Sequence, residues 1–135
     1  YHIPVFQDID AFSKLSYEAQ LQKLSPGGAI SYIEAPNMQN NIDAILTLLK
    51  HMYNTIMYSE INLKLDYCEN CGYHGAFEIK NIDGKLQFVC PNCGEKEFDH
   101  NPTLLRPCRR VCGYISSHQM NQGRMGDMKE RCEHC

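Results

Sequence analysis

Two cysteine pairs with the same local spacing constrain this chain more than any other feature. Cys68 and Cys71 form one pair, and Cys90 and Cys93 form the other. A Cys-x2-Cys-Gly turn brings two thiolates to one side of a tight loop, because the glycine adopts backbone angles that a side chain would resist. Two such turns supply the four ligands of a tetrahedral zinc ion and leave no position open for substrate. The sequence therefore predicts a structural Zn²⁺ site in a zinc ribbon over residues 67–99.

The segment between the two pairs predicts a β-hairpin. Its apolar residues flank Asp83-Gly84, a dipeptide typical of two-residue hairpin turns. An iron–sulfur or redox-active cluster of cysteines is the alternative to zinc.

The residues before the ribbon alternate between helical and extended patterns. Residues 8–24 predict one or two short helices. After a Ser-Pro-Gly-Gly break, three elements follow in a βαβ-like unit, with Asn40 or Asn41 as the helix N-cap. They are a strand at residues 29–34, a helix of about four turns from residue 41, and a strand at residues 58–65.

Composition limits the class of protein. A chain of 135 residues, 43% hydrophobic, suffices for one modest domain and not for a large enzyme with its own deep active site. It begins without methionine and shows neither a signal sequence nor an apolar run of membrane-spanning length. We expect a soluble, cytoplasmic protein that is truncated at its start. All eight cysteines lie from Cys68 onward, which favours metal or redox chemistry over a secreted disulfide framework.

The charge is unevenly distributed. The net charge is −3, but residues 101–135 hold six Lys and Arg against three Asp and Glu. A basic tail beside a zinc ribbon is found in nucleic-acid-binding modules, so such a module without catalysis is one alternative function. The ribbon itself is acidic, which argues against nucleic acid as a partner.

A short string after the ribbon carries the most specific resemblance. Residues 109–115 read RRVCGYI, and the upstream residues 27–34 read GGAISYIE. With the ribbon between them, the chain resembles the C-terminal region of the anaerobic (class III) ribonucleoside-triphosphate reductases, a family of glycyl radical enzymes. The resemblance implies that Gly113 is the site of a stable backbone radical.

The residue type suits that chemistry. A radical on Cα is stabilised when its spin is shared with the flanking amide groups, which requires a planar Cα that only glycine reaches without a steric collision. The simpler interpretation is that Gly113 is an ordinary turn glycine.

The resemblance also implies an α/β fold, the C-terminal part of a ten-stranded α/β barrel. Residues 1–66 would be a barrel fragment, residues 67–99 the inserted ribbon, and residues 100–135 the glycyl radical loop and a basic tail. The full enzyme would typically be a homodimer.

In such a family the work is divided between proteins. A radical-SAM activating enzyme with a 4Fe–4S cluster takes a hydrogen atom from the glycine, and the radical passes to a cysteine in the rest of the reductase barrel. The resulting thiyl takes the 3′ hydrogen of a ribonucleoside triphosphate, whose 2′-hydroxyl is then lost as water. Formate or a dithiol supplies the electrons, and the product is the deoxyribonucleotide for DNA synthesis. This chain would hold the radical without reducing a nucleotide alone. A free-standing spare part that restores the radical of a damaged reductase is a further alternative.

The sequence leaves more than one role open for each of the remaining four cysteines. Cys108 and Cys112 could be a redox pair, although packing is the preferred interpretation of Cys112. Cys132 and Cys135 form a third Cys-x2-Cys pair that, with His118 and His134, could bind a second metal. This pair departs from the family pattern, and we expect a frayed tail there.

Overall fold

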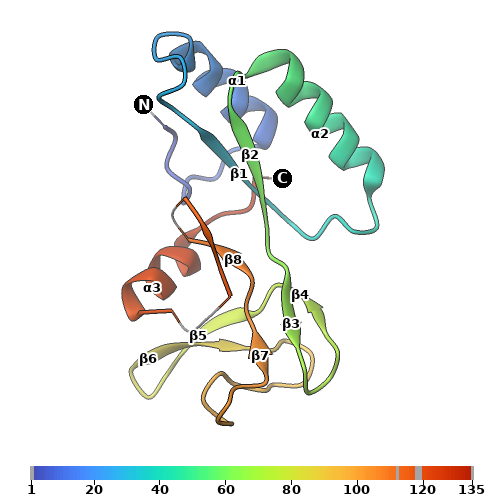
Figure 1. Cartoon of the computed structure of the whole chain (residues 1–135), viewed down its shortest axis with the longest axis vertical. Helices are drawn as coiled ribbons and strands as arrows, with labels where there is room; N and C mark the ends of the chain where they lie inside the picture. Colours follow the sequence, from blue (N-terminus) through green and yellow to red (C-terminus); the bar gives the residue numbers. More distant parts are fainter. Residues whose placement is uncertain (1, 112, 118–119, 135) are drawn as a thin grey trace. The chain divides into compact units, whose positions relative to one another are not determined.

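The computed structural model describes residues 2–111, 113–117 and 120–134, which form two compact units. The first unit comprises Tyr1–Asn62 and Arg131–Cys135, and the second comprises Leu63–Glu130. The second unit is therefore an insertion in the first (Figure 1).

The first unit contains the predicted strand, helix and strand. Strand β1 (Ser31–Ala35) is hydrogen-bonded to β2 (Ser59–Leu63), and α2 (Ile42–Thr55) connects them. Asn41 caps α2, since its side chain accepts a hydrogen bond of 3.2 Å from the Ala44 amide. Helix α2 carries the chain back along the strands, so that β1 and β2 run in the same direction (Figure 1). The βαβ-like prediction is confirmed.

A single helix precedes this βαβ unit, which agrees with the prediction of one or two short helices over residues 8–24. Helix α1 (Ala11–Gln22) begins after Asp10, whose carboxylate accepts from the Ser13 amide at 2.9 Å. One face of α1 packs with α2 and β1 in a core formed by Ala11, Leu15, Ala19, Ile33, Leu48, Met52 and Ile56.

The second unit consists of short antiparallel strands. Its sheets have the orders β4-β3-β7, β5-β6 and β8-β9. The strands are β3 (Asp66–Cys68), β4 (His74–Gly75), β5 (Glu78–Ile82), β6 (Lys85–Val89), β7 (Leu105–Arg106), β8 (Arg109–Arg110) and β9 (Ile115–Ser116). The predicted hairpin is β5–β6, and its turn residues Asp83 and Gly84 have φ angles of 52° and 78°. Positive φ at both positions is the type I′ geometry that suits the twist of a hairpin.

Helix α3 (Gln122–Glu130) was not predicted, because its sequence has little apolar periodicity. It is anchored to β6 by Gln122, whose amide accepts from the Leu86 N–H at 2.6 Å and donates to the Leu86 carbonyl at 2.8 Å. Met125 and Met128 add apolar contacts with the core that contains Phe77, Phe88 and Leu105.

These elements make a mixed helix and strand structure. The described residues contribute one strand–helix–strand unit to the first unit, and its place in a ten-stranded barrel stays a prediction. Among the described residues, no helix combines the length and the apolar character needed to cross a membrane.

Candidate metal centre and glycine hairpin

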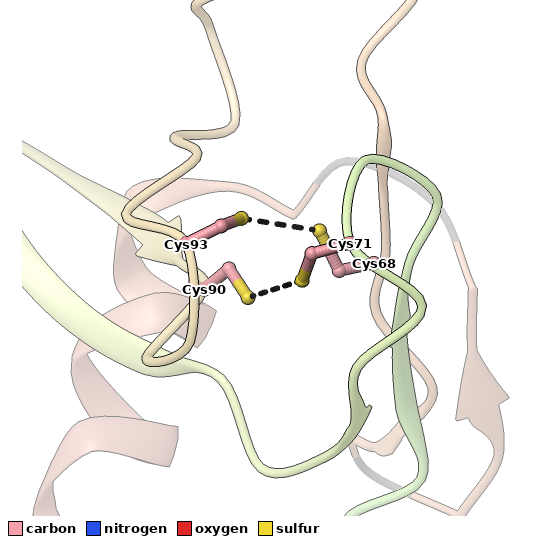
Figure 2. A group of neighbouring side chains, drawn as sticks. All are labelled: Cys68, Cys71, Cys90 and Cys93. Carbon is pink, nitrogen blue, oxygen red and sulfur yellow. Dashed lines mark hydrogen bonds between the residues drawn. The ribbon is translucent and has the colours of Figure 1, made fainter.

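The four cysteines of the two pairs converge on one point. Cys68 ends β3, Cys90 directly follows β6, and Cys71 and Cys93 complete the two turns. Their Sγ atoms all lie within 4.8 Å of one another. Figure 2 shows the side chains of Cys68 and Cys71 facing those of Cys90 and Cys93. In the described part of the chain they form the one such group of potential metal ligands. The convergence predicted from the spacing is therefore confirmed.

Both turns have the same backbone geometry. The Gly72 N–H donates to the Cys68 carbonyl at 2.9 Å, and the Gly94 N–H donates to the Cys90 carbonyl at 3.0 Å. The two glycines have φ angles of 72° and 78°, a region that residues with a side chain rarely adopt. The identical turns explain why two segments far apart in sequence present their thiols in matching ways.

The sulfur positions fit a tetrahedral zinc ion. The Sγ atoms are 3.7 Å apart between Cys68 and Cys93, and 3.7 Å apart between Cys71 and Cys90. A tetrahedron with Zn–S bonds of about 2.3 Å has edges of about 3.8 Å. All four ligands come from the protein, so a metal held here would have a complete coordination shell and a structural role.

Burial divides the four thiols into two kinds. Desolvation raises the pKa of Cys68 to about 12 and also raises the pKa of Cys90, since both side chains are buried. A hydrogen bond with the Asn92 side chain is the main cause that lowers the pKa of the exposed Cys71 to about 6. A divalent cation at the centre would supply the opposite charge that the buried thiolates need.

Gly113 lies in the turn of the hairpin formed by β8 and β9. Arg110 pairs with Ile115 in this hairpin, and the Val111 N–H donates to the Tyr114 carbonyl at 3.0 Å. Gly113 is exposed and has a φ angle of 70°, and apart from its two chain neighbours no described atom lies within 4 Å of a Cβ built on it. The preceding Cys112 lies outside the described residues. The geometry favours glycine for its backbone angle and leaves the Cα open to a partner.

A buried ion pair anchors the base of this hairpin. Asp66 accepts hydrogen bonds from the amides of Phe77 at 2.7 Å and Cys108 at 2.9 Å. The Arg109 guanidinium forms an ion pair with Asp66 through Nη2, donates from Nε to both carboxylate oxygens at 3.0 and 2.9 Å, and donates to the Phe77 carbonyl at 2.8 Å. Asp66 is fully buried and lies on β3, the strand that also carries Cys68. One strand thus connects the metal centre with the hairpin that carries Gly113.

Cys108 and Cys132 do not join the cluster. Cys108 and Cys132 are free thiols of intermediate exposure, and their predicted partners Cys112 and Cys135 lie outside the described residues, as does His118. The possible redox pair and second metal site therefore stay predictions.

The prediction of a frayed tail is wrong. The Cys132 N–H donates to the Val5 carbonyl at 2.9 Å, and His134 is buried. The His134 N–H donates to the Glu34 carbonyl at 2.8 Å, and its Nδ1 accepts from the Glu34 N–H at 2.9 Å. Backbone pairing with strand β1 outweighs the polar composition that suggested disorder.

At least three of the six Lys and Arg residues in the tail are paired with carboxylates. Arg106 pairs with Glu69, and two further tail arginines, Arg109 and Arg131, are bound to buried carboxylates. Less positive charge is therefore available at the surface than the composition suggests, which disfavours a nucleic-acid interface.

Sequence reasoning missed Asp66 as the anchor of the hairpin. The only signal was an acidic residue inside a β-prone run just before the first cysteine pair. That signal does not identify Arg109, 43 residues further along, as its partner.

Comparison with known proteins gives a consistent result over nearly the whole chain. Residues 1–134 match the family model described as anaerobic ribonucleoside-triphosphate reductase. The chain is 34% identical over 137 aligned positions to the anaerobic ribonucleoside-triphosphate reductase of Haemophilus influenzae, an alignment that covers 99% of the chain and 18% of that relative. The reductase of the same name from Escherichia coli is 32% identical, with the same coverage, and that of Enterobacteria phage T4 is 31% identical over 130 positions, 96% of the chain and 20% of the relative. The chain spans about a fifth of the length of the curated relatives it matches.

Proposed function

The chain belongs to the anaerobic ribonucleoside-triphosphate reductase family, and we propose that it is the C-terminal, radical-bearing part of such a reductase. The whole enzyme would convert ribonucleoside triphosphates to deoxyribonucleoside triphosphates for DNA synthesis. The observation that carries this proposal is the family match over residues 1–134, which includes both the cysteine ribbon and the glycine hairpin.

We assign the radical to Gly113. Gly113 is exposed at a hairpin turn, where an activating enzyme can approach, and apart from its two chain neighbours no described atom lies within 4 Å of the position that a Cβ would take. Removal of one Cα hydrogen atom leaves an unpaired electron that the flanking amide groups delocalise once the Cα becomes planar. A radical-SAM enzyme with a 4Fe–4S cluster would remove this hydrogen atom.

Cys68, Cys71, Cys90 and Cys93 would hold zinc. When bound, the ion would supply a cross-link between the two cysteine turns and would take no part in the reduction, because all four ligands are thiolates of this chain. The ribbon would thus serve as the rigid base of the hairpin, to which it is joined through Asp66 and Arg109.

An apolar stripe on α2 supports the proposal that the chain is part of a larger protein. Four residues beside the buried stripe of α2 are exposed by 45–89%, namely Ile42, Leu46, Leu49 and Tyr53. They make the apolar face of α2 wider than the part that this chain covers, as expected of a helix that packs against a further part of a larger structure. The remaining barrel would supply the thiyl cysteine, the substrate site and the dimer contacts.

The test is anaerobic electron paramagnetic resonance after incubation with a class III activating enzyme, S-adenosylmethionine and a reductant. We expect a glycine-coupled doublet in the native chain, alone or with the barrel polypeptide, and none in Gly113→Ala. Gly84→Ala is a matched control, because Gly84 also occupies a hairpin turn, has a φ angle of 78° and has free space around it. A doublet that persists in Gly113→Ala would refute the assignment. Absence of any doublet with a competent activating enzyme would favour a zinc-ribbon module without a radical.

Oxygen gives a second readout. It should attack the Gly113 radical and cleave the backbone, releasing a C-terminal piece of about 22 residues, from Tyr114 to the end of the chain. Mass spectrometry of activated protein exposed to air should find this piece, and unactivated protein should stay intact.

A further inference from the structure

The unit that carries Gly113 is joined to the first unit at two points. The chain leaves the first unit after Asn62 and re-enters it at Arg131. Any constraint on these two points also constrains the inserted residues 63–130.

One buried carboxylate binds both points. The Asn62 side-chain amide donates to Glu34 Oε1 at 2.6 Å, and Arg131 Nη1 donates to the same oxygen at 3.2 Å. Glu34 is 3% exposed and Asn62 is 8% exposed. Donors that lie 28 residues after Glu34 and 97 residues after it therefore meet on one atom.

The backbone of Glu34 is held by the residues that follow the second point. Its N–H donates to His134 Nδ1 at 2.9 Å, and its carbonyl accepts from the His134 N–H at 2.8 Å. The Cys132 N–H is bound to the Val5 carbonyl at 2.9 Å. The returning chain is thus fixed to strand β1 through the same residue that fixes the departing chain.

We propose that Glu34 is a positioning residue that clamps both connections of the 63–130 unit, so that the glycine hairpin is held for radical transfer. The clamp is a property of this chain, and its role in radical transfer rests on the proposed function. A carboxylate suits the role because it neutralises the buried guanidinium of Arg131 while also accepting from Asn62. Glutamine keeps the size of the side chain but removes the negative charge that Glu34 presents to Arg131.

The clamp is tested by hydrogen exchange on the 135-residue chain. We expect Glu34→Gln to raise exchange on the order of tenfold in both residues 59–65 and residues 130–134, with the cysteine turns and the zinc content unchanged. Glu130→Gln is the matched control, since Glu130 is exposed and lies at the same boundary. Faster exchange at one connection alone, or at neither, would overturn the clamp.

Two single-contact variants decide the matter if Glu34→Gln does not fold. Asn62→Ala and Arg131→Met each remove one donor to Glu34. The clamp predicts that each variant loosens its own connection strongly and the other connection measurably. Exchange that rises only at the mutated connection would show that the two are independent.

The role in radical transfer is tested in the intact reductase. We expect Glu34→Gln to keep the radical content within about twofold by electron paramagnetic resonance, because Gly113 stays exposed, and to lower kcat per radical about tenfold with KM unchanged. Unchanged turnover per radical would refute this role. Absence of a radical in the native enzyme would refute the proposed function, and the exchange experiment would still decide the clamp.

Discussion

Two β-hairpins of the second unit each have a glycine of positive φ in the turn, but they differ in how they are supported. In β5–β6, five residue pairs face each other across the strands, and the turn glycine is Gly84. In β8–β9 the described residues form two such pairs, and the turn glycine is Gly113. A hairpin of two pairs is not stable by itself in water, so β8–β9 depends on the buried pair of Asp66 and Arg109 at its base. The first hairpin has more paired residues and is bound to α3 through Gln122, whereas the second has an exposed turn and a base held by the buried ion pair.

Removal of the metal should have the largest effect on stability, and it should unfold the β5–β6 hairpin. The β5–β6 hairpin lies between the two cysteine turns, with Cys90 directly after β6. Binding of zinc to four thiolates contributes about 10 kcal/mol or more to folding in small zinc domains. We expect chelation, or Cys90→Ser, to unfold the second unit, as seen by hydrogen exchange and metal analysis.

Cys108→Ser is the control for this experiment, because Cys108 lies outside the cluster. It should retain the metal and the protection of β5–β6. Protection that survives chelation would show that the hairpin does not need the metal.

Loss of the ion pair between Asp66 and Arg109 should have the next largest effect on stability, and it should destabilise β8–β9 more than β5–β6. Asp66→Asn leaves the Arg109 guanidinium buried without a carboxylate, at an expected cost of about 3–5 kcal/mol. We expect faster exchange in β8–β9 than in β5–β6 and an unchanged zinc content. Glu78→Gln is the matched control, since its pair with Lys80 is exposed and should contribute less than about 1 kcal/mol. Equal loosening of both hairpins in Asp66→Asn would contradict the anchoring role.

The turn glycines should have smaller and equal effects on stability. Alanine at Gly84 or Gly113 must adopt a positive φ angle, which costs about 1–2 kcal/mol. Urea unfolding should therefore give similar losses for the two variants, whereas only Gly113→Ala should lose the radical. A much larger loss for Gly113→Ala would point to a packing role for that turn.

Acidification should have the smallest effect on stability, and it should leave both hairpins folded. Burial lowers the pKa of His134 below its ordinary value of 6.5. The unfolded chain then binds more protons than the folded chain below that pH, so the stability of the first unit should fall as the pH drops from about 6.5. The loss is at most about 1.4 kcal/mol per pH unit.

The contribution of His134 is measured by comparing the pH dependence of the free energy of unfolding in the native chain and in His134→Gln. Glutamine can keep an acceptor for the Glu34 N–H and does not titrate. Unfolding at pH 7.5 and 5.5 should show the pH-dependent loss in the native chain, and a smaller loss in the variant. Equal losses would exclude His134 as the cause.

The sequence by itself determined the local features of this protein. The cysteine turns, the Asp83-Gly84 hairpin and the Asn41 cap of α2 depend on residues within a few positions of one another, and local spacing dictates their geometry. The resemblance that led to Gly113 likewise rested on short strings, and the family match bears out the family. Tertiary structure decided which charged residues meet. Asp66 and Arg109 are 43 residues apart, and Glu34 and Arg131 are 97 residues apart, and no periodicity records such pairs. They form because a buried charge requires a partner, and the fold alone determines which opposite charge comes within reach.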